Sequence, residues 1–124
     1  MLVFYDTANK DGYASIYESH ITFNKALLEY FKDVYRVRVG CDLENKKIYI
    51  FTYDMDQSLS GEINETSLLP VSLQKSYARI CGKQLIRYIT DLFDLKIEKK
   101  GFLRFRTSYD AKKKAFVIDM KGGI

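Results

Sequence analysis

Two halves of the sequence resemble each other, and this repetition restricts the fold more than any other feature of the chain. Residues 13–16 read Tyr-Ala-Ser-Ile, and residues 77–80 read Tyr-Ala-Arg-Ile. Each copy precedes a segment in which an apolar residue returns at every fourth position, and this spacing is typical of one face of a helix. These apolar residues are Phe23, Leu27 and Phe31 in the first half, and Leu85, Ile89 and Phe93 in the second half.

Each predicted helix precedes a strand that carries two arginines at alternate positions. The pairs are Arg36 with Arg38 and Arg104 with Arg106, and an aspartate stands four residues after the second arginine of each pair. A short polar turn and a second alternating strand follow, so we predict two antiparallel hairpins. The strand, turn and closing strand are residues 35–42, 43–46 and 48–51 in the first half, and 103–110, 111–113 and 115–118 in the second.

These patterns predict an α+β fold in which two pseudo-symmetric βαββ repeats, residues 13–53 and 77–120, share one hydrophobic core. The whole chain of 124 residues has the length of a single domain, and each repeat alone has too little apolar area for its own core. Residues 54–76 are interpreted as a polar linker with the only proline, in which we expect a short strand near residues 68–73. Another strand is expected at residues 2–5.

The positive charge is concentrated in the second half of the chain. The net charge is +4, but residues 1–62 carry seven Lys and Arg against ten Asp and Glu, whereas residues 63–124 carry thirteen against six. If the protein binds an anion, the second half is expected to hold it. The alternative is that the two halves are simply solvated differently.

The arginines on the predicted strands are the main candidates for phosphate contacts. Residues two apart on a strand project from the same face, so each pair presents two guanidiniums side by side. Arginine binds phosphate bidentately, and exposed tyrosines offer surfaces on which single-stranded bases stack. The alternative is that the arginines form ion pairs with Asp42, Glu44 and Asp110, which contribute only about 0.2–1 kcal/mol each. The candidate nucleic-acid contacts are Arg79, Lys83, Arg87, Arg104 and Arg106, with Arg36 and Arg38.

The sequence contains no motif of an enzyme or of a cofactor site. Its one histidine, His20, has no nucleophile or orienting carboxylate at a suitable spacing, and Gly-rich phosphate loops, HExxH and GxSxG are absent. Cys41 and Cys81 form no CxxC pair, and Asp54 with Asp56 lacks the other ligands of a calcium loop. We therefore expect a protein without catalytic activity, metal or cofactor.

The sequence also predicts a cytoplasmic protein. Its apolar runs are too short to span a bilayer, and its first residues do not have the pattern of a signal peptide. The two cysteines fit a reducing compartment, because nothing points to export.

The first half resembles a family of DNA-binding proteins. Ile-Thr-Phe-Asn-Lys-Ala-Leu-Leu at residues 21–28, followed by Tyr-Arg-Val-Arg-Val at residues 35–39, resembles the AbrB/SpoVT/MraZ family of swapped-hairpin domains. Two copies in one chain most resemble the MraZ arrangement, and small bacterial proteins with the same duplicated layout are also similar. The sequence departs from the family at Asn24, a good helix N-cap where the family has proline, and at Leu28 and Glu29, where the family has a basic pair.

This resemblance implies a DNA-binding transcriptional regulator, and the basic second half favours nucleic-acid binding in general. We therefore expect a nucleic-acid-binding protein with DNA as its partner. The alternative is a non-enzymatic protein-interaction or structural module, which pairs through open strand edges with a second copy of itself or with another protein. A steep loss of nucleic-acid affinity with rising salt distinguishes the first function from the second.

Overall fold

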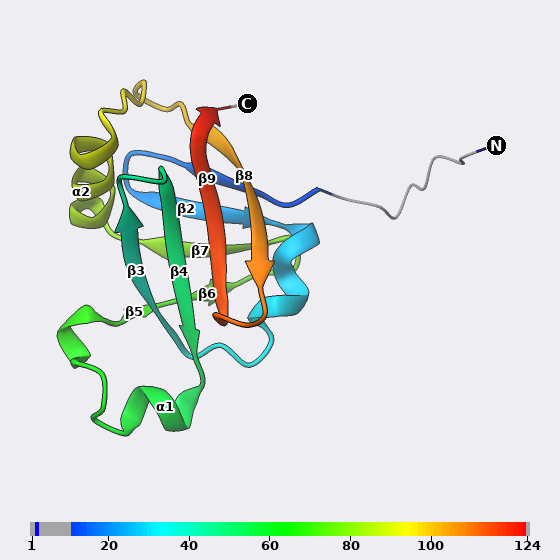
Figure 1. Cartoon of the computed structure of the whole chain (residues 1–124), viewed down its shortest axis with the longest axis vertical. Coiled ribbons are helices and arrows are strands. Elements are labelled where there is room, and N and C mark those ends of the chain that lie inside the picture. The colour runs from blue at the N-terminus through cyan, green and yellow to red at the C-terminus, as the bar shows by residue number, and fades with distance from the viewer. Residues whose placement is uncertain (1, 3–10, 124) are drawn as a thin grey trace.

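The computed structural model describes residue 2 and residues 11–123. Nine strands between Tyr13 and Gly123 form a nearly closed antiparallel β-barrel (Figure 1). The strand expected at residues 2–5 falls largely outside the described residues. Neighbouring strands follow the order β5-β3-β4-β9-β8-β1-β2-β7-β6. The strands are β1 (Tyr13–Ile16), β2 (His20–Asn24), β3 (Arg36–Asp42), β4 (Lys47–Tyr53), β5 (Leu69–Pro70), β6 (Ser72–Leu73), β7 (Tyr77–Cys81), β8 (Leu103–Asp110) and β9 (Ala115–Gly123).

Short helices connect some of these strands. The longest, α2 (Lys83–Phe93), buries Ile86 and Ile89 against the barrel, and its C-cap residue Asp94 has a left-handed backbone with a φ of 52°. No helix in the described part of the chain is long and apolar enough to cross a membrane. The helices are the 3₁₀ helices η1 (Lys25–Phe31) and η2 (Glu65–Ser67) and the α-helices α1 (Met55–Leu59) and α2 (Lys83–Phe93).

The barrel closes through the segment that the sequence analysis assigns to a linker. β5 pairs with β3, and β6 pairs with β7, and only Val71 separates β5 from β6. One extended segment, residues 69–73, therefore connects the two ends of the sheet (Figure 1). The strand expected near residues 68–73 is confirmed. Pro70 lies in the short end strand β5, a position that tolerates its missing N–H.

The predicted fold class is wrong. Strands make up 42% of the structure and helices 23%, and the architecture is a barrel-like antiparallel sheet instead of an α+β fold of two βαββ repeats of the AbrB/MraZ type. The first predicted helix begins too early, because Ile21 and Phe23 point inward as alternate residues of β2 before η1 begins at Lys25. A short 3₁₀ helix also covers less apolar surface than the expected amphipathic α-helix. Strand pairing therefore provides most of the architecture.

The two segments with the repeated Tyr-Ala-x-Ile pattern occupy different places in the barrel. β1 lies between β8 and β2, whereas β7 lies between β2 and β6. Both strands bury their second and fourth residues, which are Ala14 and Ile16 in β1 and Ala78 and Ile80 in β7. Inward alternation is thus a local cause of the similarity. The internal duplication, with its boundaries, stays a prediction.

Both predicted hairpins are confirmed, and their turns are alike. β3 pairs with β4 and β8 pairs with β9, each across a turn of four residues. The last turn residue, Lys46 or Lys114, is left-handed with a φ of 53° or 52°. The aspartates that follow the arginine pairs, Asp42 and Asp110, accept backbone N–H bonds within these turns at 3.1 and 3.0 Å. This turn geometry explains why an aspartate follows each arginine pair.

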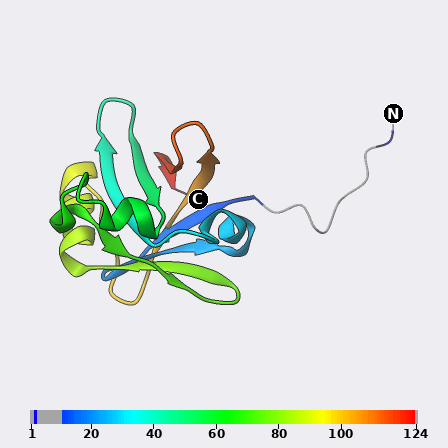
Figure 2. The same cartoon turned by 90° about the horizontal axis from the view of Figure 1, so that it is seen from below.

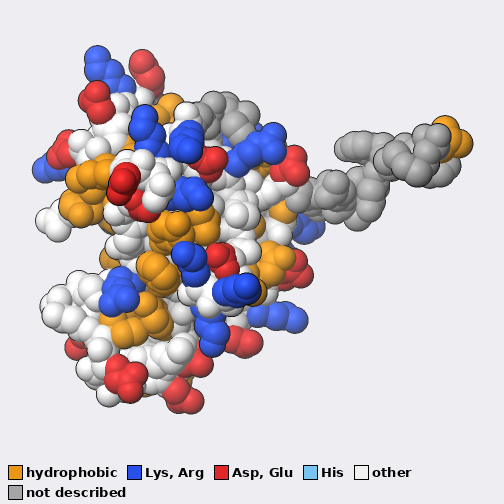
Figure 3. All heavy atoms as spheres, in the orientation of Figure 1, with side chains coloured by type: hydrophobic (Ala, Val, Ile, Leu, Met, Phe, Trp, Pro, Cys, Tyr) orange, Lys and Arg blue, Asp and Glu red, His pale blue; other side chains and the backbone are white. Residues whose placement is uncertain are grey.

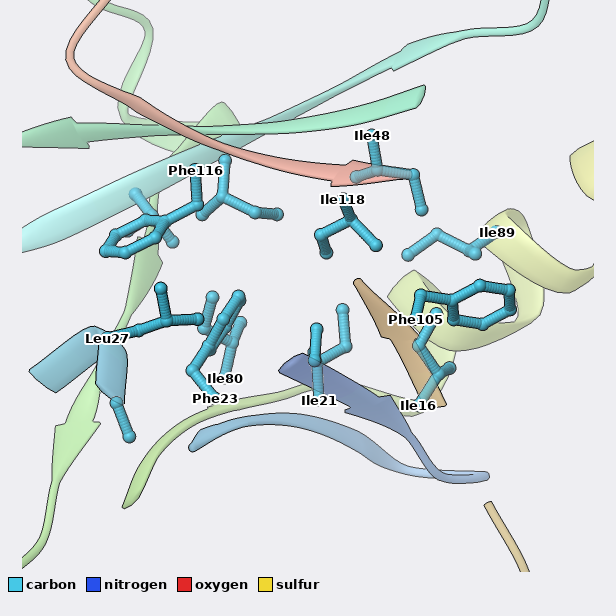
Figure 4. Close-up of a cluster of buried hydrophobic side chains, with 14 of the residues drawn as sticks. Ile16, Ile21, Phe23, Leu27, Ile48, Ile80, Ile89, Phe105, Phe116 and Ile118 are labelled. Atoms are coloured by element: carbon cyan, nitrogen blue, oxygen red, sulfur yellow. The ribbon is translucent and has the colours of Figure 1, made fainter. Parts of the chain in front are cut away.

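The core lies between the two sides of the barrel wall. β3, β4, β9 and β8 form one side, and β1, β2 and β7 form the other (Figure 2). Figure 4 shows the apolar side chains that meet between them. Phe23, Phe31 and Phe116 are fully buried, and their ring centroids lie 4.2 to 5.5 Å apart. Truncation of such a phenylalanine to alanine costs about 3–5 kcal/mol.

Candidate nucleic-acid interface

The outer face of β8, β1, β2 and β7 carries the candidate site, and strand register decides which side chains meet there. Arg104 of β8 lies opposite Ser15 of β1. Ser15 lies opposite Thr22 of β2, and Thr22 lies opposite Arg79 of β7. Residues directly opposite each other project from the same face of a sheet. Two short hydroxyl side chains therefore stand between two long cationic ones.

The short side chains in the middle of this row leave a concave region of about 690 Å³, which we call the arginine hollow. Ser15 and Thr22 lie between the two arginines. No aspartate or glutamate is found among its described lining residues, so nothing in the lining neutralises the guanidiniums. The other principal lining residues are Tyr13, Tyr17, His20 and Tyr77.

Aromatic rings line the hollow, and two of them lie close to Arg104. Tyr17 stacks on His20 with ring centroids 4.4 Å apart, and it contacts Phe102 at 5.2 Å. The guanidinium carbon of Arg104 lies 5.4 Å from the ring centroid of Phe102 and 5.8 Å from that of Tyr13. These cation–π contacts favour one placement of the guanidinium and leave its charge intact.

Asn24 holds the rim of the hollow in place. Its Oδ1 accepts a hydrogen bond from the backbone N–H of Tyr13 at 2.9 Å, and its Nδ2 donates to the carbonyl oxygen of Asp11 at 2.8 Å. The asparagine lies at the N-cap position of η1 but forms no side-chain cap bond there. Its side chain instead connects the end of β2 to the start of β1 and to the segment before it.

Arg79 brings an unsatisfied donor to the site. Its Nε is buried and has no hydrogen-bond partner among the described residues. A buried donor without a partner costs about 1–3 kcal/mol. An acceptor oxygen of a bound ligand would satisfy this donor, and an anionic oxygen would do so most strongly.

His20 is mainly neutral at pH 7. Burial and then the nearby charge of Arg79 lower the pKa of its imidazole below the ordinary value of 6.5. Its Nδ1 lies 3.0 Å from the Oγ of Ser19. The positive charge of the hollow therefore comes from Arg79 and Arg104, while His20 provides a ring surface and a neutral hydrogen-bonding group.

The sequence pattern indicated the two arginines of the hollow but not the residues around them. Tyr13 and Ser15 alternate along β1, and Tyr17 follows its last residue, so this spacing was a readable signal for one outward face. His20 was considered only as a catalytic residue, and no partner for catalysis was found in the sequence. The pairing of β1 with β8, which brings the face together with Arg104, joins segments from opposite ends of the chain and leaves no local pattern.

The other five predicted contacts lie outside the arginine hollow. Arg106 lines a separate concave region beside η1, and Lys83 and Arg87 line another beside α2. Arg36 and Arg38 lie on β3, which β4 and β9 separate from β8. The predicted contacts therefore occupy several parts of the surface, and the structure brings only Arg79 and Arg104 together.

Asp42 and Asp54, two of the acidic residues that the sequence suggested as arginine or cation partners, have other contacts. Asp42 accepts hydrogen bonds from the side chain and the backbone of Asn45, and these bonds lower the pKa of Asp42. Asp54 caps the N-terminus of α1 and accepts the N–H of Gln57 at 2.8 Å. Within residues 11–123, no group of three or more His, Cys, Asp or Glu side chains could hold a metal ion.

No family model matches the chain, and no curated protein or solved structure is significantly similar to it. The resemblance to the AbrB/SpoVT/MraZ family therefore rests only on the residues quoted for it. The function has to be argued from the chemistry of the site.

Proposed function

We propose that the protein binds single-stranded nucleic acid, with a backbone phosphate between Arg79 and Arg104. The observation that carries the proposal is a hollow with two guanidiniums, one of them with a buried unpartnered Nε, and with no carboxylate among its described lining residues. Guanidinium donors match phosphate oxygens bidentately. The hydroxyls of Ser15 and Thr22, between the arginines, add neutral donors.

The aromatic lining favours a single strand over a duplex. Tyr13, Tyr17 and Tyr77 line the same hollow as the arginines, and Phe102 contacts Tyr17. Bases stack on such rings only when they are unpaired and turned outward, and each stacked base contributes about 1–3 kcal/mol. Phosphate contacts of this kind give affinity without sequence readout. The proposed protein therefore binds single strands with little sequence preference.

This proposal narrows the function that the sequence suggested. A transcriptional regulator of the AbrB/MraZ type binds duplex DNA, so duplex DNA is the comparison ligand in the test. A cytoplasmic location is part of the proposal, and it is supported by the free thiols of Cys41 and Cys81, which are typical of a reducing compartment.

The test is fluorescence anisotropy with labelled oligo-dT, oligo-U and a DNA duplex of about 12 nucleotides, within the site sizes known for single-strand-binding barrels. We expect both single strands to bind more tightly than the duplex. The logarithm of the affinity should fall linearly with the logarithm of the salt concentration, with a slope of about −0.7 per phosphate contact. Tighter binding of the duplex, or affinity that does not change with salt, contradicts the proposal.

A matched pair of variants assigns the contact to the hollow. Arg104→Ala removes one proposed phosphate contact and should make the salt slope less negative by about 0.7. Arg36→Ala removes a strand arginine outside the hollow and should leave the slope unchanged. Equal slopes for the two variants would show that nucleic acid, if bound, lies elsewhere.

A further inference from the structure

Another concave region, which we call the β3–α2 slot, lies between β3 and the start of α2. Its volume is about 700 Å³, and it shares no lining residue with the arginine hollow. β3, the segment from η2 to β5, and α2 form its three sides (Figure 1). Its principal lining residues are Arg38, Val39, Leu69, Lys83, Leu85 and Tyr88.

The slot borders an open edge of β3. β5 pairs with this edge only at Arg36 and Val37. No strand in the described part of the chain pairs with the remaining five residues of the edge, which end at Asp42. Five residues of extended chain span about 17 Å. The open edge is thus long enough for a short peptide strand.

The backbone groups on this edge can be assigned from the pairing of β4. Thr52 donates its N–H to the carbonyl oxygen of Lys114 at 3.0 Å, so even-numbered residues of β4 bond to β9 and odd-numbered residues bond to β3. The odd-numbered residues of β4 lie opposite even-numbered residues of β3. Val39 and Cys41 therefore direct their N–H and C=O groups toward the open edge.

The interior of the slot is apolar. Val39, Leu69 and Leu85 are partly buried and pack against the core, so their outer surfaces form a fixed lining. Tyr88 of α2 is 56% exposed beside them. Hydrophobic side chains are visible on the surface at the level of α2 (Figure 3). An apolar side chain of a ligand would bury itself here.

The start of α2 makes one end of the slot attractive to a carboxylate. Lys83 and Arg38 line the slot, and no aspartate or glutamate is found among its described lining residues. α2 has 11 residues, and no side chain caps its first N–H groups. These groups carry the positive end of the helix dipole.

We propose that the β3–α2 slot binds an extended peptide segment of a partner protein. The peptide adds as a strand to the open edge of β3, places an apolar side chain on Leu69 and Leu85, and directs a carboxylate toward Lys83. Strand addition of this kind takes affinity from main-chain hydrogen bonds and specificity from the pockets beside the edge. The proposal does not depend on nucleic-acid binding, because the two sites share no residue.

The first experiment selects ligands from random octapeptides on phage, displayed either with a free C-terminal carboxylate or as internal segments. We expect enrichment of peptides that combine an apolar residue with a carboxylate. The display format that yields them shows whether the carboxylate belongs to the peptide C-terminus or to an acidic side chain. A synthetic copy of the most enriched peptide then serves as the probe in fluorescence anisotropy. No enrichment in either format overturns the proposal.

Two charge-reversal variants on α2 locate the peptide. Lys83→Glu should weaken binding of the probe peptide at least about tenfold, because a carboxylate then faces another carboxylate. Arg87→Glu makes the same charge change at an exposed position of α2 outside the slot and should change affinity less than about twofold. Equal effects of the two variants overturn the assignment.

Amide hydrogen exchange by NMR tests strand addition directly. On addition of the probe peptide, the amides of Val39 and Cys41 should become protected, whereas those of Arg38 and Gly40, which already bond to β4, should not change. Unchanged exchange at Val39 and Cys41 overturns the proposal. Sedimentation of the free protein tests whether a second copy of the chain occupies the edge instead. If the protein dimerises with rising concentration and the dimer protects Val39 and Cys41, the proposal of a partner peptide is also overturned.

Discussion

The arginine hollow and the outer face of β3 and β4 carry the same types of residue in different arrangements. In the hollow, Arg104 stands opposite the short side chain of Ser15. On β3, Arg38 stands opposite Phe51, and its guanidinium lies 6.0 Å from that ring centroid and 5.7 Å from that of Tyr53. Figure 3 views this second face, where cationic side chains lie among hydrophobic ones.

Both arginines have aromatic rings within about 6 Å, so the cross-strand neighbour decides where the open volume beside a strand arginine lies. Beside serine or threonine, the guanidinium borders open volume that a ligand can fill. Beside Phe51, the guanidinium of Arg38 lies near rings of β4, and the open volume that it borders is the β3–α2 slot at the edge of the sheet.

The largest expected effect is the loss of affinity for oligo-dT when both arginines are removed from one face, compared with the same change on the other face. Arg79→Ala with Arg104→Ala should lower the affinity for oligo-dT at least about 100-fold, because each hydrogen bond to a charged group contributes about 1.5–3 kcal/mol. The matched double variant, Arg36→Ala with Arg38→Ala, should lower it less than about threefold. Anisotropy measures the affinities, and circular dichroism verifies the fold. Similar losses in both double variants would contradict the distinction between the faces.

The aromatic residues of the two faces should also differ. Tyr17→Ala removes a ring of the hollow and should lower the affinity for single strands about 5- to 100-fold, as expected for one lost base stack. Tyr49→Ala, on the outer face of β4, removes a ring that faces the Lys113 ammonium at 5.3 Å and should leave the affinity unchanged. The same anisotropy titration measures both variants, and a larger loss for Tyr49→Ala would place the bases on the second face.

The pH dependence of His20 reports on the electrostatics of the hollow. Burial is the larger cause and the charge of Arg79 the smaller cause of its lowered pKa, so Arg79→Ala should raise that pKa without restoring the ordinary value of 6.5. In the free protein, the unfolded chain binds the proton more tightly, so the free energy of unfolding should fall as the pH drops from 6.5 through the folded-state pKa. NMR titration of the imidazole protons measures both pKa values. If the pKa of His20 were unchanged in Arg79→Ala, the charge of Arg79 would have no influence on the imidazole, which contradicts the prediction.

The two hairpins give the smallest predicted effect. Lys46 and Lys114 are both left-handed, so glycine at either position should raise the free energy of unfolding by about 0.5–1 kcal/mol. Because the two φ angles are nearly equal, the two substitutions should have similar effects. Urea denaturation measures the change, and destabilisation by either substitution would contradict the left-handed assignment.

Elements whose partners are near in the chain could be predicted from the sequence. The hairpins β3–β4 and β8–β9 follow from alternation across short polar turns. The four-residue apolar spacing located α2, which begins at Lys83, two residues before the predicted helix. The same spacing misplaced the first helix, because Phe23 belongs to an alternating strand as well as to a helical pattern.

The sequence by itself thus determined the hairpins, the inward residues of each strand and the basic second half, because local backbone geometry sets side-chain periodicity. Only the tertiary structure decided that residues 69–73 close the barrel and that Ser15 and Thr22 stand between Arg79 and Arg104. Which strands become neighbours depends on burying the whole apolar set in one core. That choice is a property of the complete chain and leaves no mark in a short window of sequence.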